Sequence, residues 1–163
     1  MQTSRFLLCF LFLSATAVAQ EISDADKALI QKIQEAGGQA MPLAKNDARL
    51  TVAFHLSDKD VTDDTLALLK DAASIHSLNL RGTKITDAGL AHLAGLKGLT
   101  RLHLEKTAVT DAGLAHLASL PALEYLNLYE TKVTDAGLPH ISGIKTLRRL
   151  FVWQSGITEA GEE

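Results

Sequence analysis

The chain has 163 residues, the size of one domain, and its 19 acidic residues outnumber its 16 lysines and arginines, for a formal net charge of −3. No basic excess attracts a phosphate backbone, so nucleic acid is not an expected partner. The single cysteine, Cys9, lies in a segment expected to be removed, which excludes thiol catalysis, cysteine-based metal sites and disulfides from the mature chain.

Residues 1–19 have the pattern of a secretory signal peptide. Arg5 gives a positive start, residues 6–13 are apolar, and Ala-Val-Ala at 17–19 is a cleavage site before Gln20. The apolar run is shorter than the roughly 20 residues that span a bilayer, which argues against an uncleaved anchor. We therefore expect an exported protein, periplasmic or extracellular, with a mature net charge of −4 and no membrane span.

Residues 20–48 are expected to form an N-terminal helical cap and a connector. The spacing predicts a helix over 23–36, with Ser23 or Asp24 as its cap, apolar residues on one side, and a glycine pair at 37–38 as its stop. Residues 39–49, which contain a proline and an Asn-Asp pair, are expected to be the connector. The helix should cover the first apolar layer of the following segment, the alternative being a partner-binding helix.

From residue 49 onward the sequence repeats every 24 residues. The segment Thr-Asp-Ala-Gly-Leu begins at Thr86, Thr110 and Thr134, and looser copies begin at Thr62 and Thr158. A fixed period of roughly 20–50 residues indicates stacked structural units. We expect about five units over residues 49–163, the last one incomplete.

Each unit predicts a short strand, a turn and a short helix. Alternation such as Leu102-x-Leu104 is typical of a strand with one buried face, and Phe54-His55-Leu56 is the first, weaker copy. Thr110 is placed as a helix N-cap, and Asp111 lies in the first turn, where the helix dipole favours an anion. One such unit cannot bury its leucines alone, so the units should stack with their strands parallel.

The pattern L-x-x-L-x-L-x-x-T-x-[IV]-T-D-A-G-L resembles the leucine-rich-repeat superfamily, in its 24-residue bacterial version with Thr where Asn or Cys is more usual. The resemblance implies an α/β solenoid, with parallel strands on its concave side and short helices on its convex side. It also implies that the hydroxyls at the Thr position bond backbone groups of adjacent coils. That position is occupied by Thr83, Thr107, Thr131 and, as a departure, Ser155.

The aromatic stretches at 123–129 and 151–154 are similar to those of secreted planctomycete-type repeat proteins. In that family such arrays often accompany a c-type cytochrome domain. This chain has no Cys-x-x-Cys-His, so the haem does not carry over and no cofactor is expected.

The sequence stops at Glu163, where the last helix should begin. Leu150, Val152 and Ile157 are therefore expected to form an uncovered apolar layer. Either the chain is a fragment of a longer product, which we favour, or this open end pairs with another chain.

Two polar columns also recur with the period. A metal-binding histidine ladder or a calcium site is conceivable, but no carboxylates accompany the histidines locally, and each aspartate lies at a helix start. We expect a structural role for the aspartates, no metal, and no catalysis, because nothing marks an activated nucleophile or an oxyanion site. Whether the histidines bind anything is left open. The columns are His92, His116 and His140, and Asp63, Asp87, Asp111 and Asp135.

Function is expected at the strand positions that vary between units, which point outward along the concave side. The three predicted columns are Ser77, Arg101, Tyr125 and Arg149; Asn79, His103, Asn127 and Phe151; and Arg81, Glu105, Tyr129 and Trp153. Aromatic residues and arginine are enriched at binding hot spots. The alternative is that Phe151 and Trp153 only cover the C-terminal layer.

We expect a non-enzymatic module that recognises another protein through its concave face. The expected partner-binding residues are Arg101, His103, Glu105, Tyr125, Asn127, Tyr129, Arg149, Phe151 and Trp153. The alternatives are an accessory module of a larger envelope or cytochrome-linked assembly and, less favoured, a glycan-binding module. Self-association through the C-terminal end is also left open.

Overall fold

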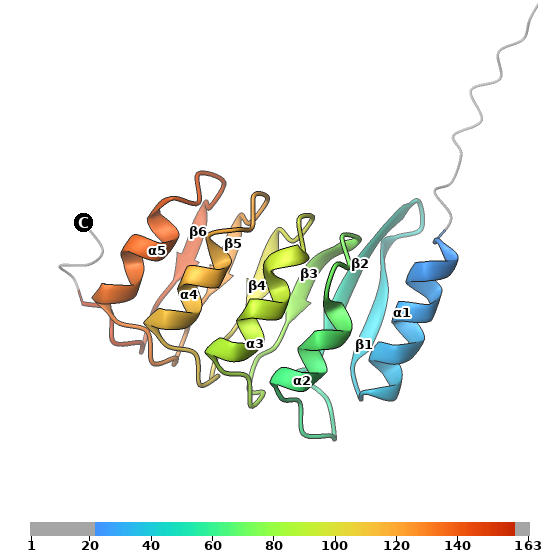
Figure 1. The fold of residues 1–163 in the computed structure, drawn as a ribbon, viewed down its shortest axis with the longest axis horizontal. Helices are drawn as coiled ribbons and strands as arrows, with labels where there is room; N and C mark the ends of the chain where they lie inside the picture. Colours follow the sequence, from blue (N-terminus) through green and yellow to red (C-terminus); the bar gives the residue numbers. More distant parts are fainter. Residues whose placement is uncertain (1–21, 159–163) are drawn as a thin grey trace, which may run out of the picture.

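The computed structural model describes residues 22–158, so the expected signal peptide lies outside the described residues. Six strands form one sheet in chain order, and the helices lie along one side of it (Figure 1). The strands are β1 (Gln39–Ala44), β2 (Asp47–Ala53), β3 (Ile75–Asn79), β4 (Arg101–His103), β5 (Tyr125–Asn127) and β6 (Arg149–Phe151). The helices are α1 (Asp24–Glu35), α2 (Asp63–Leu66), α3 (Asp87–Ala91), α4 (Asp111–Leu117) and α5 (Leu138–Ser142), with 3₁₀ turns η1 (Ala67–Leu69), η2 (His92–Gly95) and η3 (Asp135–Gly137).

The N-terminal part is a helix followed by a β-hairpin. Helix α1 begins where the Ser23 hydroxyl accepts the Asp26 amide, and it ends before Gly37, whose φ is +87°. The connector predicted for 39–49 is wrong, because β1 pairs antiparallel with β2. Pro42 is compatible with this strand because β1 lies at the sheet edge, where one missing amide donor is tolerated.

The first repeat strand lies two residues earlier than predicted. Val52 pairs with Leu78, and Phe54 is buried, whereas Leu56 of the predicted Phe54–Leu56 copy is 69% exposed. The first unit is therefore two residues longer than the others. A prediction that extends the 24-residue period back from β3 consequently places the first strand two residues too late.

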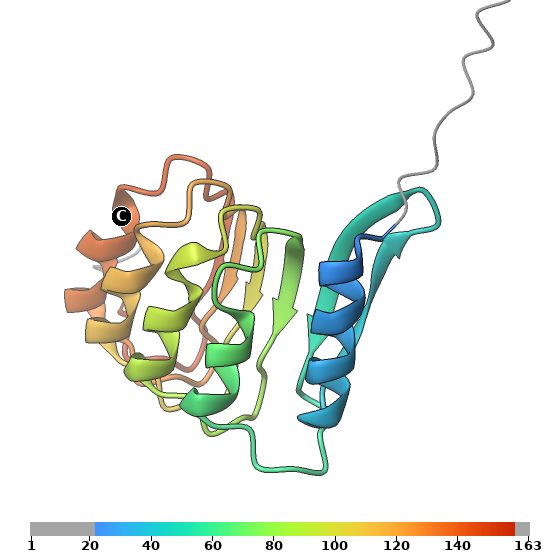
Figure 2. The same ribbon diagram turned by 45° about the vertical axis from the view of Figure 1, so that its right-hand side comes forward.

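Strands β2 to β6 are parallel and in regular register from β3 onward. Leu78, Leu102 and Leu126 pair across β3, β4 and β5 and are fully buried. Figure 2 shows α2 to α5 on one side of these strands and α1 beside the β1–β2 hairpin. Strands pack about 4.8 Å apart and helices about 8–10 Å apart, so the sheet takes the inner side of the bend. The predicted α/β solenoid is confirmed.

The hydroxyls at the Thr position of the repeat bond within their own coil. Thr107 Oγ1 donates to the carbonyl of Leu104 at 2.7 Å, and Thr83, Thr131 and Ser155 make the equivalent bond to the residue three positions earlier. The expectation of bonds to adjacent coils is wrong, because these hydroxyls close a turn. That turn contains a residue in the left-handed region of each coil, namely Gly82, Lys106, Glu130 and Gln154.

The repeat aspartates make the polar link between coils. The Asp87 carboxylate accepts the Thr110 amide at 2.8 Å and the Thr110 hydroxyl at 2.6 Å. The same pair of bonds joins Asp63 to Thr86, Asp111 to Thr134 and Asp135 to Thr158. Each of these threonines thus donates backward to the preceding coil, a contact that the sequence pattern did not predict.

No helix within residues 22–158 combines the length and the apolar character needed to cross a membrane.

Candidate partner-binding face

The structure brings the predicted concave columns together. Arg101, Tyr125 and Arg149 are direct neighbours on β4, β5 and β6, and so are His103, Asn127 and Phe151. Hydrogen bonds from the Lys106 amide to the Tyr129 carbonyl, and from the Glu130 amide to the Trp153 carbonyl, align Glu105, Tyr129 and Trp153 in the same way. We call the outward side of β3–β6, with these three columns, the concave face.

Aromatic side chains pack against one another across this face. The Tyr125 ring lies 4.8 Å from His103 and 5.2 Å from Phe151, in tilted arrangements. Tyr129 stacks on Trp153 at 5.4 Å with the planes 12° apart. These separations fall within the favourable range of about 4.5–7 Å. Trp153 is nevertheless 70% exposed and Phe151 is 45% exposed, so a pre-arranged aromatic surface faces solvent.

Glu105 lies beneath this surface and is 8% exposed. Its Oε1 lies 2.9 Å from His103 Nδ1 and accepts the Asn127 amide at 2.7 Å, while Asn127 Oδ1 accepts the Tyr129 backbone amide. The other carboxylate oxygen, Oε2, is buried and has no partner among the described residues. Glu105 was predicted to contact a partner, but its geometry suits it to orient His103 and Asn127.

The Glu105 carboxyl is ionised in this setting. Burial raises its pKa. Hydrogen bonds from His103 and from its own backbone amide, together with the charges of His103 and Arg81, lower the pKa by more than burial raises it, so the pKa lies below its usual value. A buried carboxylate held by fixed donors is an anchor for the strands it joins.

Cations lie over the two partly buried tyrosine rings. The Arg101 guanidinium is 5.4 Å from the centre of the Tyr125 ring, and the Lys106 ammonium is 5.8 Å from that of Tyr129 and 3.1 Å from a Glu130 oxygen. Such contacts contribute about 0.5–1 kcal/mol when exposed.

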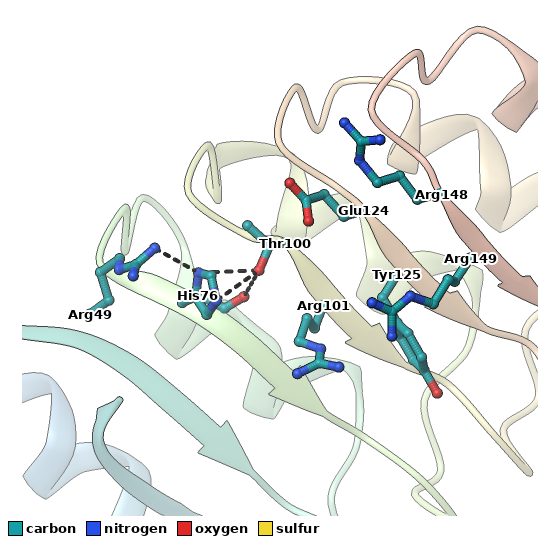
Figure 3. Close-up of a pocket in the computed structure, with 8 residues that line it drawn as sticks. All are labelled: Arg49, His76, Thr100, Arg101, Glu124, Tyr125, Arg148 and Arg149. Atoms are coloured by element: carbon teal, nitrogen blue, oxygen red, sulfur yellow. Dashed lines mark hydrogen bonds between the residues drawn. The ribbon is translucent and has the colours of Figure 1, made fainter. Parts of the chain in front are cut away.

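A hollow of about 320 Å³ lies beside these residues, at the N-terminal ends of the parallel strands. Figure 3 shows its lining, which is Arg49, His76, Thr100, Arg101, Glu124, Tyr125, Arg148 and Arg149. Arg101, Tyr125 and Arg149 were predicted from the sequence to lie on this face, whereas Arg49, His76 and Arg148 were not. His76, Thr100, Glu124 and Arg148 follow the same 24-residue period one position before the first column, so the period itself carried the signal.

His76, which lines the hollow, and Asp47, which pairs with the lining residue Arg49, have shifted pKa values. Hydrogen bonds from the Arg49 side chain and backbone lower the pKa of Asp47 to about 2. Partial burial lowers the pKa of His76, and the charges of Arg49 and Arg101 lower it further, against smaller opposite effects of Asp47 and Glu124. His76 is therefore neutral at pH 7.

The recurring histidines lie on the helical side, on η2, α4 and α5. Within residues 22–158, no three histidine, cysteine, aspartate or glutamate side chains gather in a way that could hold a metal ion. Whether His92, His116 and His140 bind anything stays open.

Comparison with known proteins supports the fold. The family model described as "Leucine Rich repeat" matches residues 72–94. The solved structure of Leiomodin-1 Actin-Binding Site 2 is similar, with a TM-score of 0.55, 16% identity, and coverage of 86% of this chain and 84% of that one. An internalin from Listeria monocytogenes is 24% identical over 58% of this chain and 32% of its own length, with a TM-score of 0.39. No curated protein sequence matches. The leucine-rich-repeat fold is confirmed.

Proposed function

We propose that this leucine-rich-repeat solenoid is a non-enzymatic module that recognises another protein through its concave face. The observation that carries the proposal is the exposed aromatic and arginine surface on β4–β6. These residue types dominate binding hot spots. The rest of the scaffold repeats nearly unchanged, so its irregular positions are the ones free to specify a partner.

The arrangement of the side chains supports binding as well as their chemistry. Tyr125 lies between His103 and Phe151, and Tyr129 is stacked on Trp153, so these side chains lose little conformational freedom when a partner binds. The name of the similar leiomodin structure describes an actin-binding site, which is consistent with protein recognition by this kind of fold.

We place the module outside the cytoplasm because of the signal-peptide pattern of residues 1–19. Mass spectrometry of the protein from its own cells tests this proposal. We expect a chain that starts at Gln20 and is found in the periplasm or the medium. A protein that keeps residues 1–19 and stays inside the cell would contradict it.

Replacement of Tyr129 and Trp153 by alanine tests the recognition surface. We expect the double variant to lose at least about tenfold in partner capture from an envelope extract, since each truncated hot spot costs about 2 kcal/mol. The matched control is His116→Ala with His140→Ala, two exposed residues on the helical side. Unchanged capture by the Tyr129/Trp153 variant, with unchanged circular dichroism, would contradict the proposal.

A glycan ligand is the second candidate, and the exposed indole of Trp153 favours it, because sugar rings stack on exposed aromatic faces. A glycan array separates the two. Binding that Trp153→Ala abolishes would favour a sugar, and silence together with protein capture would favour the first proposal.

An accessory or self-associating role is supported by the C-terminal end of the sheet, where Leu150 is 36% exposed and Phe151 is 45% exposed. Light scattering on the mature chain tests self-association. A dimer that Leu150→Arg dissociates would support it, and a monomer would contradict it. A cytochrome gene beside the full reading frame would support the accessory role.

A further inference from the structure

The hollow at the N-terminal ends of the strands concentrates positive charge on a chain that is acidic as a whole. Of the five arginines in residues 22–158, four line it: Arg49, Arg101, Arg148 and Arg149. Arg49 is paired with Asp47. Among the described residues, no carboxylate lies at ion-pair distance from Arg101, Arg148 or Arg149. Glu124 is the acidic residue among the eight that line the hollow.

Three guanidinium groups without a carboxylate partner in one hollow do not stabilise the sheet, because like charges that lie near one another repel. The lowered pKa of His76 is consistent with a positive local potential, since Arg49 and Arg101 contribute to it after burial. The leucine layers and the Asp–Thr links hold the fold, and these arginines belong to neither. An anion is the ligand that such a hollow would bind.

The spacing of the arginines points to several anionic groups rather than one. Arg101 and Arg149 come from β4 and β6 in the same register, with Tyr125 of β5 between them, so they are two strands apart; Arg49 of β2 lies two residues before that register. Two strand spacings are about 9.6 Å. A ligand with two anionic groups at this spacing can pair with both arginines without drawing the two side chains together. In an extended peptide of the polyproline II type, side chains three residues apart lie on the same side and recur about every 9.3 Å, close to that distance.

The chemistry of the lining favours carboxylates on a peptide. The planar guanidinium presents two parallel donors that fit the two oxygens of a carboxylate. Tyr125 lies between Arg101 and Arg149, under the stretch of peptide that would join two acidic side chains (Figure 3). Its ring gives the intervening residues an apolar surface to pack on.

We propose that the hollow binds an extended, acidic segment of a protein partner, with carboxylates about three residues apart that pair with Arg101 and Arg149. This inference rests on the proposed function, because it names the kind of sequence that the concave face takes.

The test uses a synthetic peptide, Gly-Glu-Gly-Gly-Glu-Gly-Gly-Glu-Gly with blocked ends, and its glutamine counterpart, titrated calorimetrically into the mature chain. We expect the glutamate peptide to bind and the glutamine peptide not to bind. Arg101→Gln with Arg149→Gln should weaken binding at least about tenfold. The control Lys32→Gln with Lys132→Gln removes the same charge from two exposed side chains outside the hollow and should keep the affinity.

A second readout comes from His76. A carboxylate bound nearby favours the charged imidazole, so NMR titration should show that the pKa of His76 rises when the glutamate peptide is bound. The arginine variant, checked by circular dichroism for an intact fold, should show no such rise.

Equal binding of the glutamate and glutamine peptides, or an unchanged affinity of the arginine variant, would overturn the inference. Inorganic phosphate that binds as tightly as the peptide would overturn the assignment to a peptide. Partner capture separates this failure from that of the proposed function. Capture that depends on Tyr129 and Trp153 while the glutamate peptide fails to bind leaves recognition standing and removes only the acidic segment.

Discussion

The glycine of each Thr-Asp-Ala-Gly segment is required by the aspartate of the preceding coil. A β-carbon at Gly113 would overlap Asp87 Oδ1, and Gly89 and Gly137 are in the same position against Asp63 and Asp111. The sequence motif thus combines two features of one contact: the carboxylate that accepts two bonds from the next coil, and the absence of a side chain that would displace it.

Gly113→Ala should therefore lower the free energy of unfolding by roughly 1–3 kcal/mol, the usual cost of overpacking. The control is Gly143→Ala, where nothing lies within 4 Å of the added carbon and φ is −75°. That change should be neutral or slightly stabilising, because it restricts the unfolded chain. Urea denaturation of both variants measures the difference, and equal effects at the two sites would contradict the close contact.

Glu105 gives the protein a specific dependence on acid. Its pKa is lower in the folded protein than the ordinary value of 4.5, so its carboxylate stabilises the fold fully above that value. This contribution is lost as the pH falls through the folded pKa. Glu105→Gln should accordingly destabilise the protein at pH 7, and the difference from wild type should shrink below about pH 4.5. Thermal melts across pH 2–7 measure it, and a difference that grows in acid would contradict the assignment.

Neighbouring coils are joined by the Asp–Thr pairs as well as by the strand hydrogen bonds and the leucine layers. Asp87 and Thr110 share two hydrogen bonds, one of them from a backbone amide that no alanine at position 87 could satisfy. Asp87→Ala should lower the free energy of unfolding by about 1–3 kcal/mol. A double-mutant cycle with Thr110→Val should give a coupling energy above about 0.5 kcal/mol. If the two substitutions change the free energy of unfolding in a strictly additive way, the Asp87–Thr110 pair does not join the two coils.

The elements that the sequence predicted well are those within the regular repeat. The parallel strands β3–β6 and the helix starts follow from the 24-residue period, because equal units must stack in equal register. The hairpin was missed because Pro42 and the Asn-Asp pair suggested a loop, although an edge strand tolerates proline. The hydroxyl of Thr107 was assigned to the wrong coil because a repeat pattern gives positions but not the direction of a hydrogen bond.

The 24-residue period also predicted only part of the concave face. The period was sufficient to place Arg101, Tyr125 and Arg149 side by side. It could not show that Glu105 is buried, because burial at that position depends on the neighbouring His103 and Asn127. The hollow needs Arg49, which lies on the strand whose register was predicted two residues out.

In the whole molecule, the residues that repeat and the residues that vary between coils lie on different sides of the sheet. The helical side and the core repeat from coil to coil, and the aromatic and arginine residues gather on the concave face of the last strands. A concave sheet presents these residues from several strands at once, so one partner can contact all of them. Export and a bacterial origin stay predictions of the sequence.

The most direct test of recognition through the concave face is site-specific photo-cross-linking in the cells that make the protein. A photoreactive phenylalanine analogue replaces Tyr125 on β5 in one variant and the exposed Ala115 on α4 in the other. We predict a discrete cross-linked protein from position 125 and none from position 115. Cross-links from position 115 alone, or none from position 125 in a correctly folded variant, would contradict the account.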